Sequence, residues 1–171
     1  ILSSMYLELN DWELVKEKAV VENILQARTI SSLKRVCREL ISRLKSLDEA
    51  ELAFLVEATS IEQGYLLWVA VCRQYRFIAE FATEVVRERY ISLKHDLTYE
   101  DFDIFFNQKA DWHMELEDIK PSTRKKLRQV LFRMLREAGF LGANNMINAV
   151  MLSPMFIKVI AKTDSKGLLF F

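Results

Sequence analysis

Apolar residues recur along most of the chain with the spacing of amphipathic helices. One stripe, between residues 29 and 47, contains Leu33, Val36, Cys37, Leu40, Ile41 and Leu44. These positions follow the i, i+3, i+4, i+7 order of a helix that buries one face. A stripe of the same form between residues 119 and 141 contains Leu127, Val130, Leu131, Met134, Leu135 and Ala138. The pattern predicts an all-α fold.

Helix-start signals add further predicted helices. A polar cap with an acid or amide three residues later occurs at Asn10, Asp48, Ser60 and Thr98. For the helix around Leu33, the available caps are Thr29, Ser31 and Ser32, and Ser153 before Pro154 starts a last helix. The segment near 142–152 predicts a small β-hairpin or an ordered loop. Only four Gly and two Pro leave few turns for an all-β fold.

The composition shifts between Lys94 and Leu97, which predicts two parts. Residues 1–95 form an N-terminal helical bundle, and residues 96–171 form a C-terminal helical domain. The second part has the order of a winged helix-turn-helix: "DFDIFFNQKA", a turn at "IKPST", a basic helix and a hairpin that would serve as the wing. Many helical hairpins share this order, so the motif needs support from other features.

The chain is neutral, with 24 basic and 24 acidic residues, but its charges are segregated. Residues 96–118 hold eight acids against one base, and residues 120–136 hold seven bases and no acid. Opposite the apolar stripe of that basic helix lie Lys125, Arg128, Gln129, Phe132, Arg133 and Arg136. This face is predicted to be free for a partner. The alternatives are an ordinary solvated face and pairing with the acidic block.

The helix around Leu33 carries a second concentration of bases, with six between residues 28 and 45 against Glu39. Two basic faces on a neutral protein favour neutralisation of a polyanion's phosphates. Hydroxyl side chains near helix N-termini would add anion contacts. The predicted DNA-binding residues are therefore Arg28, Ser31, Lys34, Arg35, Arg38, Ser122, Thr123, Arg124, Lys125, Arg128, Gln129, Arg133 and Arg136.

Motifs for other chemistry are few. His95 and His113 lack the spacing of a metal site, and Cys37 and Cys72 are expected to be buried thiols of a cytoplasmic protein. Trp112 and the other two tryptophans are expected in the core, although Trp112 beside a turn could stack on a base. Five acids could hold a divalent ion, but a solvated or arginine-paired face is the more frequent arrangement: Asp101, Asp103, Asp111, Glu115 and Asp118.

We therefore expect no enzymatic activity, cofactor, metal ion or small-molecule substrate. The longest apolar run, residues 65–72, is well short of the ~20 residues of a membrane span, and we expect no membrane contact.

Three blocks together resemble the BrxA family of the bacteriophage-exclusion (BREX) systems: "NILQARTISSLKRVCRELISRL", "YLLWVAVCRQYRFIAEFATEVVRERY" and "DFDIFFNQKADWHMELEDIKPSTRKKLRQVLFRMLREAGFL". The resemblance covers nearly the whole chain. It implies an all-helical, cytoplasmic, non-enzymatic DNA-binding protein, similar in fold to the NusB antitermination factors. Its partners would be double-stranded DNA and other BREX proteins. The family has no catalytic motif to transfer.

Lys and Arg outnumber Asn and Gln on both basic faces, which predicts backbone binding with little sequence preference. One alternative function is RNA binding like that of NusB. The other is a helical adaptor that docks other defence proteins, for which an exposed apolar patch including Phe132 would be the clue.

Overall fold

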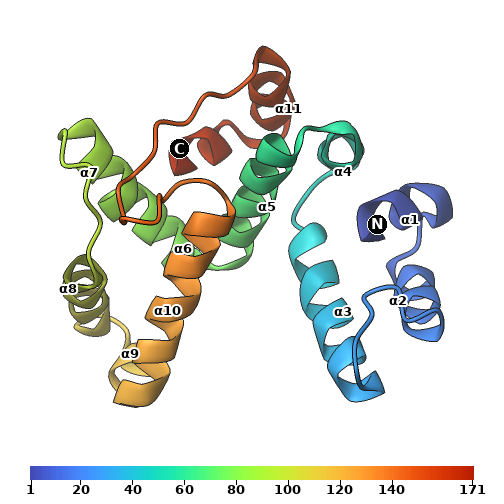
Figure 1. Ribbon diagram of the computed structural model, residues 1–171, viewed down its shortest axis with the longest axis horizontal. Helices are drawn as coiled ribbons and strands as arrows, with labels where there is room; N and C mark the ends of the chain where they lie inside the picture. The colour runs from blue at the N-terminus through green and yellow to red at the C-terminus, as the bar shows by residue number, and fades with distance from the viewer.

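The computed structural model describes residues 1–171 and contains eleven α-helices, one π-helix and one 3₁₀-helix (Figure 1). The first five helices are α1 (Leu2–Leu9), α2 (Trp12–Val21), α3 (Ile30–Leu44), α4 (Glu49–Glu57) and α5 (Ser60–Gln74). A nearly continuous helical segment follows, with α6 (Arg76–Phe81), the π-helix η1 (Ala82–Arg87) and α7 (Glu88–Ile91). The remainder comprises α8 (Tyr99–Ala110), α9 (Met114–Glu117), α10 (Pro121–Glu137), α11 (Pro154–Asp164) and the 3₁₀-helix η2 (Ser165–Phe170). The all-α prediction is confirmed.

Several helix starts lie where the sequence placed them. Thr29 caps α3 by accepting a hydrogen bond from the Ser32 amide, and Ser153 caps α11. Asp48 and Thr98 begin complete capping boxes at α4 and α8. A side-chain oxygen at these positions satisfies an amide that has no partner within its own helix.

Two predicted caps are wrong by one residue, and two helices, α1 and the short α9, were not predicted. Asp11, not Asn10, caps α2, because Asn10 takes a left-handed conformation that ends α1. Thr59 makes the capping box of α5, so Ser60 is already helical. The helix α1 has no capping side chain at its start, which explains why no start signal preceded it.

Helix α5 lies at the centre of the molecule, and seven of its 15 residues are buried. Tyr65 and Trp68 of this helix pack on Phe140, and Tyr65 also contacts Phe156 and Phe171. Thirty-two buried residues form one contiguous core that includes members from both sides of residue 95. The division at residue 95 stays a prediction, since the parts share this core.

The acidic helix α8 joins the core through its phenylalanines. Phe77 and Phe81 of α6 pack at 5.1–6.0 Å, centroid to centroid, on three rings of α8: Phe102, Phe105 and Phe106. One face of α8 is therefore apolar and fixed, which leaves its carboxylates on the remaining faces.

The segment after α10 forms an ordered loop and not a β-hairpin. It makes two isolated antiparallel bridges, Asp96 with Met146 and Leu141 with Ile147. The Ile147 amide donates to the His95 carbonyl, and the Leu97 amide donates to Asn145. Because the loop pairs with the segment before α8, some of its backbone amides and carbonyls already have hydrogen-bond partners there. The predicted wing has no strands.

Helices α3 and α10 diverge from α5 as two arms, and the N-terminus of each lies at its free end (Figure 1). Helix α11 and the C-terminus lie at the opposite side of the molecule from these ends. None of the helices combines the length and the apolar character that a membrane crossing requires.

Candidate nucleic-acid interface

Arg124 of the basic helix α10 is bound internally. Its guanidinium donates from Nε to Asp103 Oδ1 at 3.0 Å, from Nη2 to the Asp103 carbonyl at 2.8 Å and from Nη1 to Asn107 at 2.7 Å. It also lies 4.5 Å from the centre of the Phe106 ring. A planar cation that is stacked and multiply bonded in this way is held firmly.

Arg128, one turn later, binds the same carboxylate. It pairs with Asp103 and lies 4.6 Å over the Tyr99 ring. The predicted arrangement, with Arg128 on a free face, is therefore not what the structure shows. The acidic block supplies the counter-charge for these two arginines, as the internal-pairing alternative required.

Phe132 and Arg136 also lie differently from the predicted free face. Phe132 is 0% exposed and packs edge-on against Tyr99. Arg136 donates to Asn145 at 2.6 Å. The exposed patch around Phe132, expected for an adaptor, is absent because burying its large ring removes far more apolar area from water than burying Leu127 would.

A narrower basic face of α10 remains open to solvent. Its exposed predicted residues are Ser122, Thr123, Lys125, Gln129 and Arg133, and Lys126 joins them. Arg133 has only a weak contact to Glu137 at 3.6 Å, and both side chains are well exposed. The first turn has no side-chain cap, so its free amides lie beside these residues at the end of the arm.

The α3 arm carries the more complete basic face. The predicted residues Arg28, Ser31, Lys34, Arg35 and Arg38 are all exposed, and Lys45 extends their line. None of the five cations among these residues makes a salt bridge. At 1.5 Å per residue, the 15-residue helix presents this face over ~22 Å.

Glu39, the one acid of α3, pairs with Arg43 and Tyr75. Its carboxylate accepts hydrogen bonds from the Tyr75 hydroxyl and from Arg43, whose guanidinium lies over the Tyr75 ring. The Tyr75 hydrogen bond, with help from Arg43, lowers the pKa of Glu39. The acid thus helps to hold α3 against Tyr75, and because its charge also acts on Arg38 it lies at the edge of the basic face.

The candidate metal and redox groups are dispersed. Asp101 belongs to a capping box and pairs with Arg89, while Asp103 binds the arginines of α10. No three His, Cys, Asp or Glu side chains lie close enough together to hold a metal ion. Cys37 and Cys72 are buried and free, as predicted, and burial raises the pKa of both thiols.

Trp112 does not anchor the core. Its side chain is 87% exposed in the turn between α8 and α9, next to the exposed Met114. Trp68 is buried as expected, and Trp12 stacks on Tyr6.

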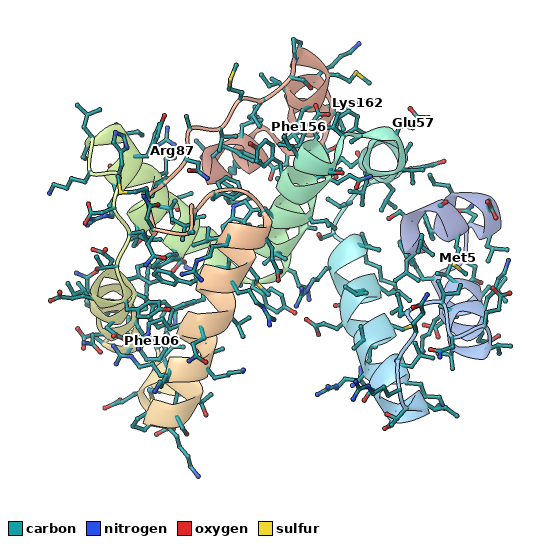
Figure 2. All side chains as sticks on the ribbon, in the orientation of Figure 1. Met5, Glu57, Arg87, Phe106, Phe156 and Lys162 are labelled. Atoms are coloured by element: carbon teal, nitrogen blue, oxygen red, sulfur yellow. The ribbon has the colours of Figure 1, made fainter.

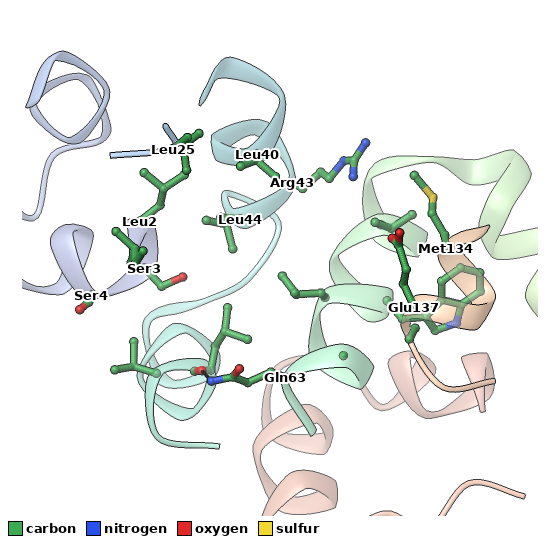
Figure 3. Close-up of a pocket in the computed structure, with 18 residues that line it drawn as sticks. Leu2, Ser3, Ser4, Leu25, Leu40, Arg43, Leu44, Gln63, Met134 and Glu137 are labelled. Atoms are coloured by element: carbon green, nitrogen blue, oxygen red, sulfur yellow. Dashed lines mark hydrogen bonds between the residues drawn. The ribbon is translucent and has the colours of Figure 1, made fainter. Parts of the chain in front are cut away.

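An apolar groove of about 490 Å³ lies between the bases of the two arms (Figure 3). Leu40 and Leu44 of α3 form one wall and Met134 of α10 part of the other, with Leu67 of α5 between them. Two of the six residues of the predicted apolar stripe of α10, Met134 and Ala138, thus line this groove, while Leu131 and Leu135 enter the core.

Sequence reasoning missed one basic residue near the α3 face. Lys16 of α2 lies beside Lys34, Arg35 and Arg38 along a groove between the two helices. A helical projection of α2 places Lys16 beside the buried Val15 and Ala19, which was the available signal.

The chain is similar to known proteins over most of its length. The BrxA family profile matches residues 1–164. A BREX protein BrxA of Bacillus cereus is 33% identical over 127 residues, which is 74% of this chain and 64% of that protein. A BREX protein BrxA of Escherichia coli is 26% identical over 99% of this chain and 80% of its own length.

A crystal structure of an uncharacterized protein from Magnetospirillum magneticum has the same fold, with a TM-score of 0.76 at 20% identity over 99% of this chain and 87% of the other. The profile match over nearly the whole length places the chain in the BrxA family of the BREX phage-defence systems.

Proposed function

We propose that this protein is a non-enzymatic, cytoplasmic DNA-binding component of a BREX system, with other BREX proteins as further partners. It binds double-stranded DNA through the α3 face and the open part of the α10 face. The observation that carries the proposal is the line of exposed α3 cations without ionic partners, Lys34, Arg35 and Arg38 above all. Unpaired like charges repel one another, and phosphates relieve that repulsion.

Duplex DNA suits the placement of the charges on two arms. Each strand carries one phosphate per ~3.4 Å of the duplex axis, so the ~22 Å face of α3 is long enough to meet several of them. The open residues are mainly Lys and Arg, with Gln129 as the main candidate for reading a base edge. Binding should therefore depend strongly on salt and weakly on sequence.

The test is fluorescence anisotropy with a labelled duplex of about 25 base pairs over a salt series. Lys34→Gln/Arg38→Gln tests α3, and Lys125→Gln/Lys126→Gln tests α10. Each pair should weaken binding and reduce the slope of log affinity against log salt by about 2. The control is Lys158→Gln/Lys162→Gln on α11, which removes the same charge from the opposite side of the molecule (Figure 2). If all three double variants lose affinity equally, the effect depends on the net charge of the protein and not on these two faces.

Competition with a single-stranded RNA of the same length tests the NusB-like alternative. We expect the duplex to be displaced only by excess RNA. If RNA competes at lower concentration than unlabelled duplex, RNA is the preferred ligand.

The apolar groove favours a second candidate function, a helical adaptor. Leu67 is 45% exposed between the arms, and 12 of the 18 lining residues are hydrophobic, so an amphipathic helix of another BREX protein could dock there. Leu67→Asp should then abolish co-purification with the partner, whereas Ile61→Asp, on the exposed part of the same helix, should not. Retention by both variants would exclude the groove.

A further inference from the structure

The groove between α2 and α3 differs from an ordinary charged surface. It has a volume of about 710 Å³, and its α3 side is lined by Ser31, Lys34, Arg35 and Arg38. On the α2 side, Lys16 adds a fourth cation, which also pairs with Glu13 at 2.8 Å, and Glu17 is the only acid that lines the groove. The cations therefore surround a concave channel, where their fields overlap.

Two valines of α2, Val20 and Val21, complete the lining. Val21 is 84% exposed, and Val20 is partly buried. Three of the four cations of the channel thus lie on α3, and α2 adds two aliphatic side chains next to Lys16 and Glu17. This combination matches a chain that carries both anionic and apolar units. The sugar–phosphate backbone is such a chain, because each charged phosphate is followed by the C–H face of a sugar.

We propose that the α2–α3 groove holds the sugar–phosphate backbone of one strand of the bound DNA, with Lys16 as a phosphate contact opposite the α3 cations. The inference rests on the proposed DNA-binding function and specifies how α3 meets the duplex: along one strand, not inserted into the major groove by its N-terminus. Ser31 lies in the first turn of α3, near Thr29, which caps the helix. Glu17 opposes binding because its carboxylate faces the same channel.

Two variants in the groove test the inference: one should lose affinity for the duplex, and the other should gain it. Lys16→Gln should weaken duplex binding about three- to tenfold and reduce the salt slope by about 1. Lys18→Gln is the matched control, because Lys18 lies on the same short helix but does not line the groove. Glu17→Gln should strengthen binding about two- to fivefold, while Glu22→Gln, outside the groove, should change it little. A gain of affinity cannot result from misfolding.

The outcomes separate this inference from the proposed function. If Lys34→Gln/Arg38→Gln weakens binding but the Lys16 and Glu17 variants behave like their controls, the strand does not lie in the groove and DNA binding by α3 stands. If the wild-type protein binds no duplex at low salt, both are overturned. If an acidic peptide displaces the duplex at lower concentration than unlabelled DNA does, the groove is a protein site and the inference fails.

Discussion

Individual arginines of this protein have different roles that depend on whether a carboxylate lies within reach. Arg124 and Arg128 share Asp103, whereas Arg35 and Arg38 have no acidic partner. Residue counts and periodicity do not distinguish these cases, because an arginine that is paired and stacked can lie against the core as an apolar side chain would. The sequence therefore showed that acidic and basic residues are segregated, but it did not show which of the arginines pair with a carboxylate.

Replacing Arg128 should affect stability and not DNA binding. Arg128→Gln removes the ion pair with Asp103 and the stacking on Tyr99, for a loss of about 1–3 kcal/mol in the free energy of unfolding. Urea denaturation measures this loss, and anisotropy with duplex DNA should show an unchanged salt slope. If the salt slope of a fully folded variant falls by about 1, Arg128 contacts a phosphate and this prediction is wrong.

Glu39 should make stability sensitive to acid. Its pKa lies below the ordinary value of 4.5, so the stability that it contributes is complete above that pH and is lost as the pH falls through the lowered pKa. Unfolding at a series of pH values should show wild type and Glu39→Gln converging at low pH and differing at neutral pH. Glu57→Gln, at an exposed position without ion pairs, should show no such convergence.

At the scale of elements, helix starts were predictable and helix orientation was not. Caps are local, so Thr29, Asp48 and Thr98 could be identified from a few neighbouring residues. Helix α10 owes its rotation to contacts with α8, in which Asp103 lies 21 residues before Arg124, and with α5, which is farther away in the sequence. Its stripe is consequently divided between the core and the groove, and its basic face is reduced to its outer part.

Helices α4 and α5 are joined by a buried ion pair. Glu51 is fully buried, and both of its oxygens accept hydrogen bonds from Arg73 at 2.7 and 2.8 Å. Glu51→Ala should lower the free energy of unfolding by about 3–5 kcal/mol, because it leaves the Arg73 charge without compensation. In thermal denaturation, Glu51→Leu/Arg73→Met should be more stable than Glu51→Ala. A double variant that is less stable than the single one would contradict this explanation.

At the scale of the whole molecule, the all-helical class was predictable from composition and periodicity, but the two arms were not. Their divergence results from contacts that converge on α5, such as the approach of Gly64 to Ala138, where a Cβ on Gly64 would lie 3.5 Å from the Ala138 backbone. The isolated arms would be ordinary amphipathic helices. Only the shared core fixes the distance between them.

If duplex DNA binds both arms as proposed, that fixed distance sets the spacing between the two contacts along the duplex. A duplex presents the same face to a protein once every ~10–10.5 base pairs, so two contact points held rigidly apart can meet it only at one helical phase. Hydroxyl-radical cleavage of a bound duplex should therefore show two short protected tracts with the same spacing on unrelated sequences. Protection that is continuous, or spacing that varies with sequence, would indicate that only one arm is used.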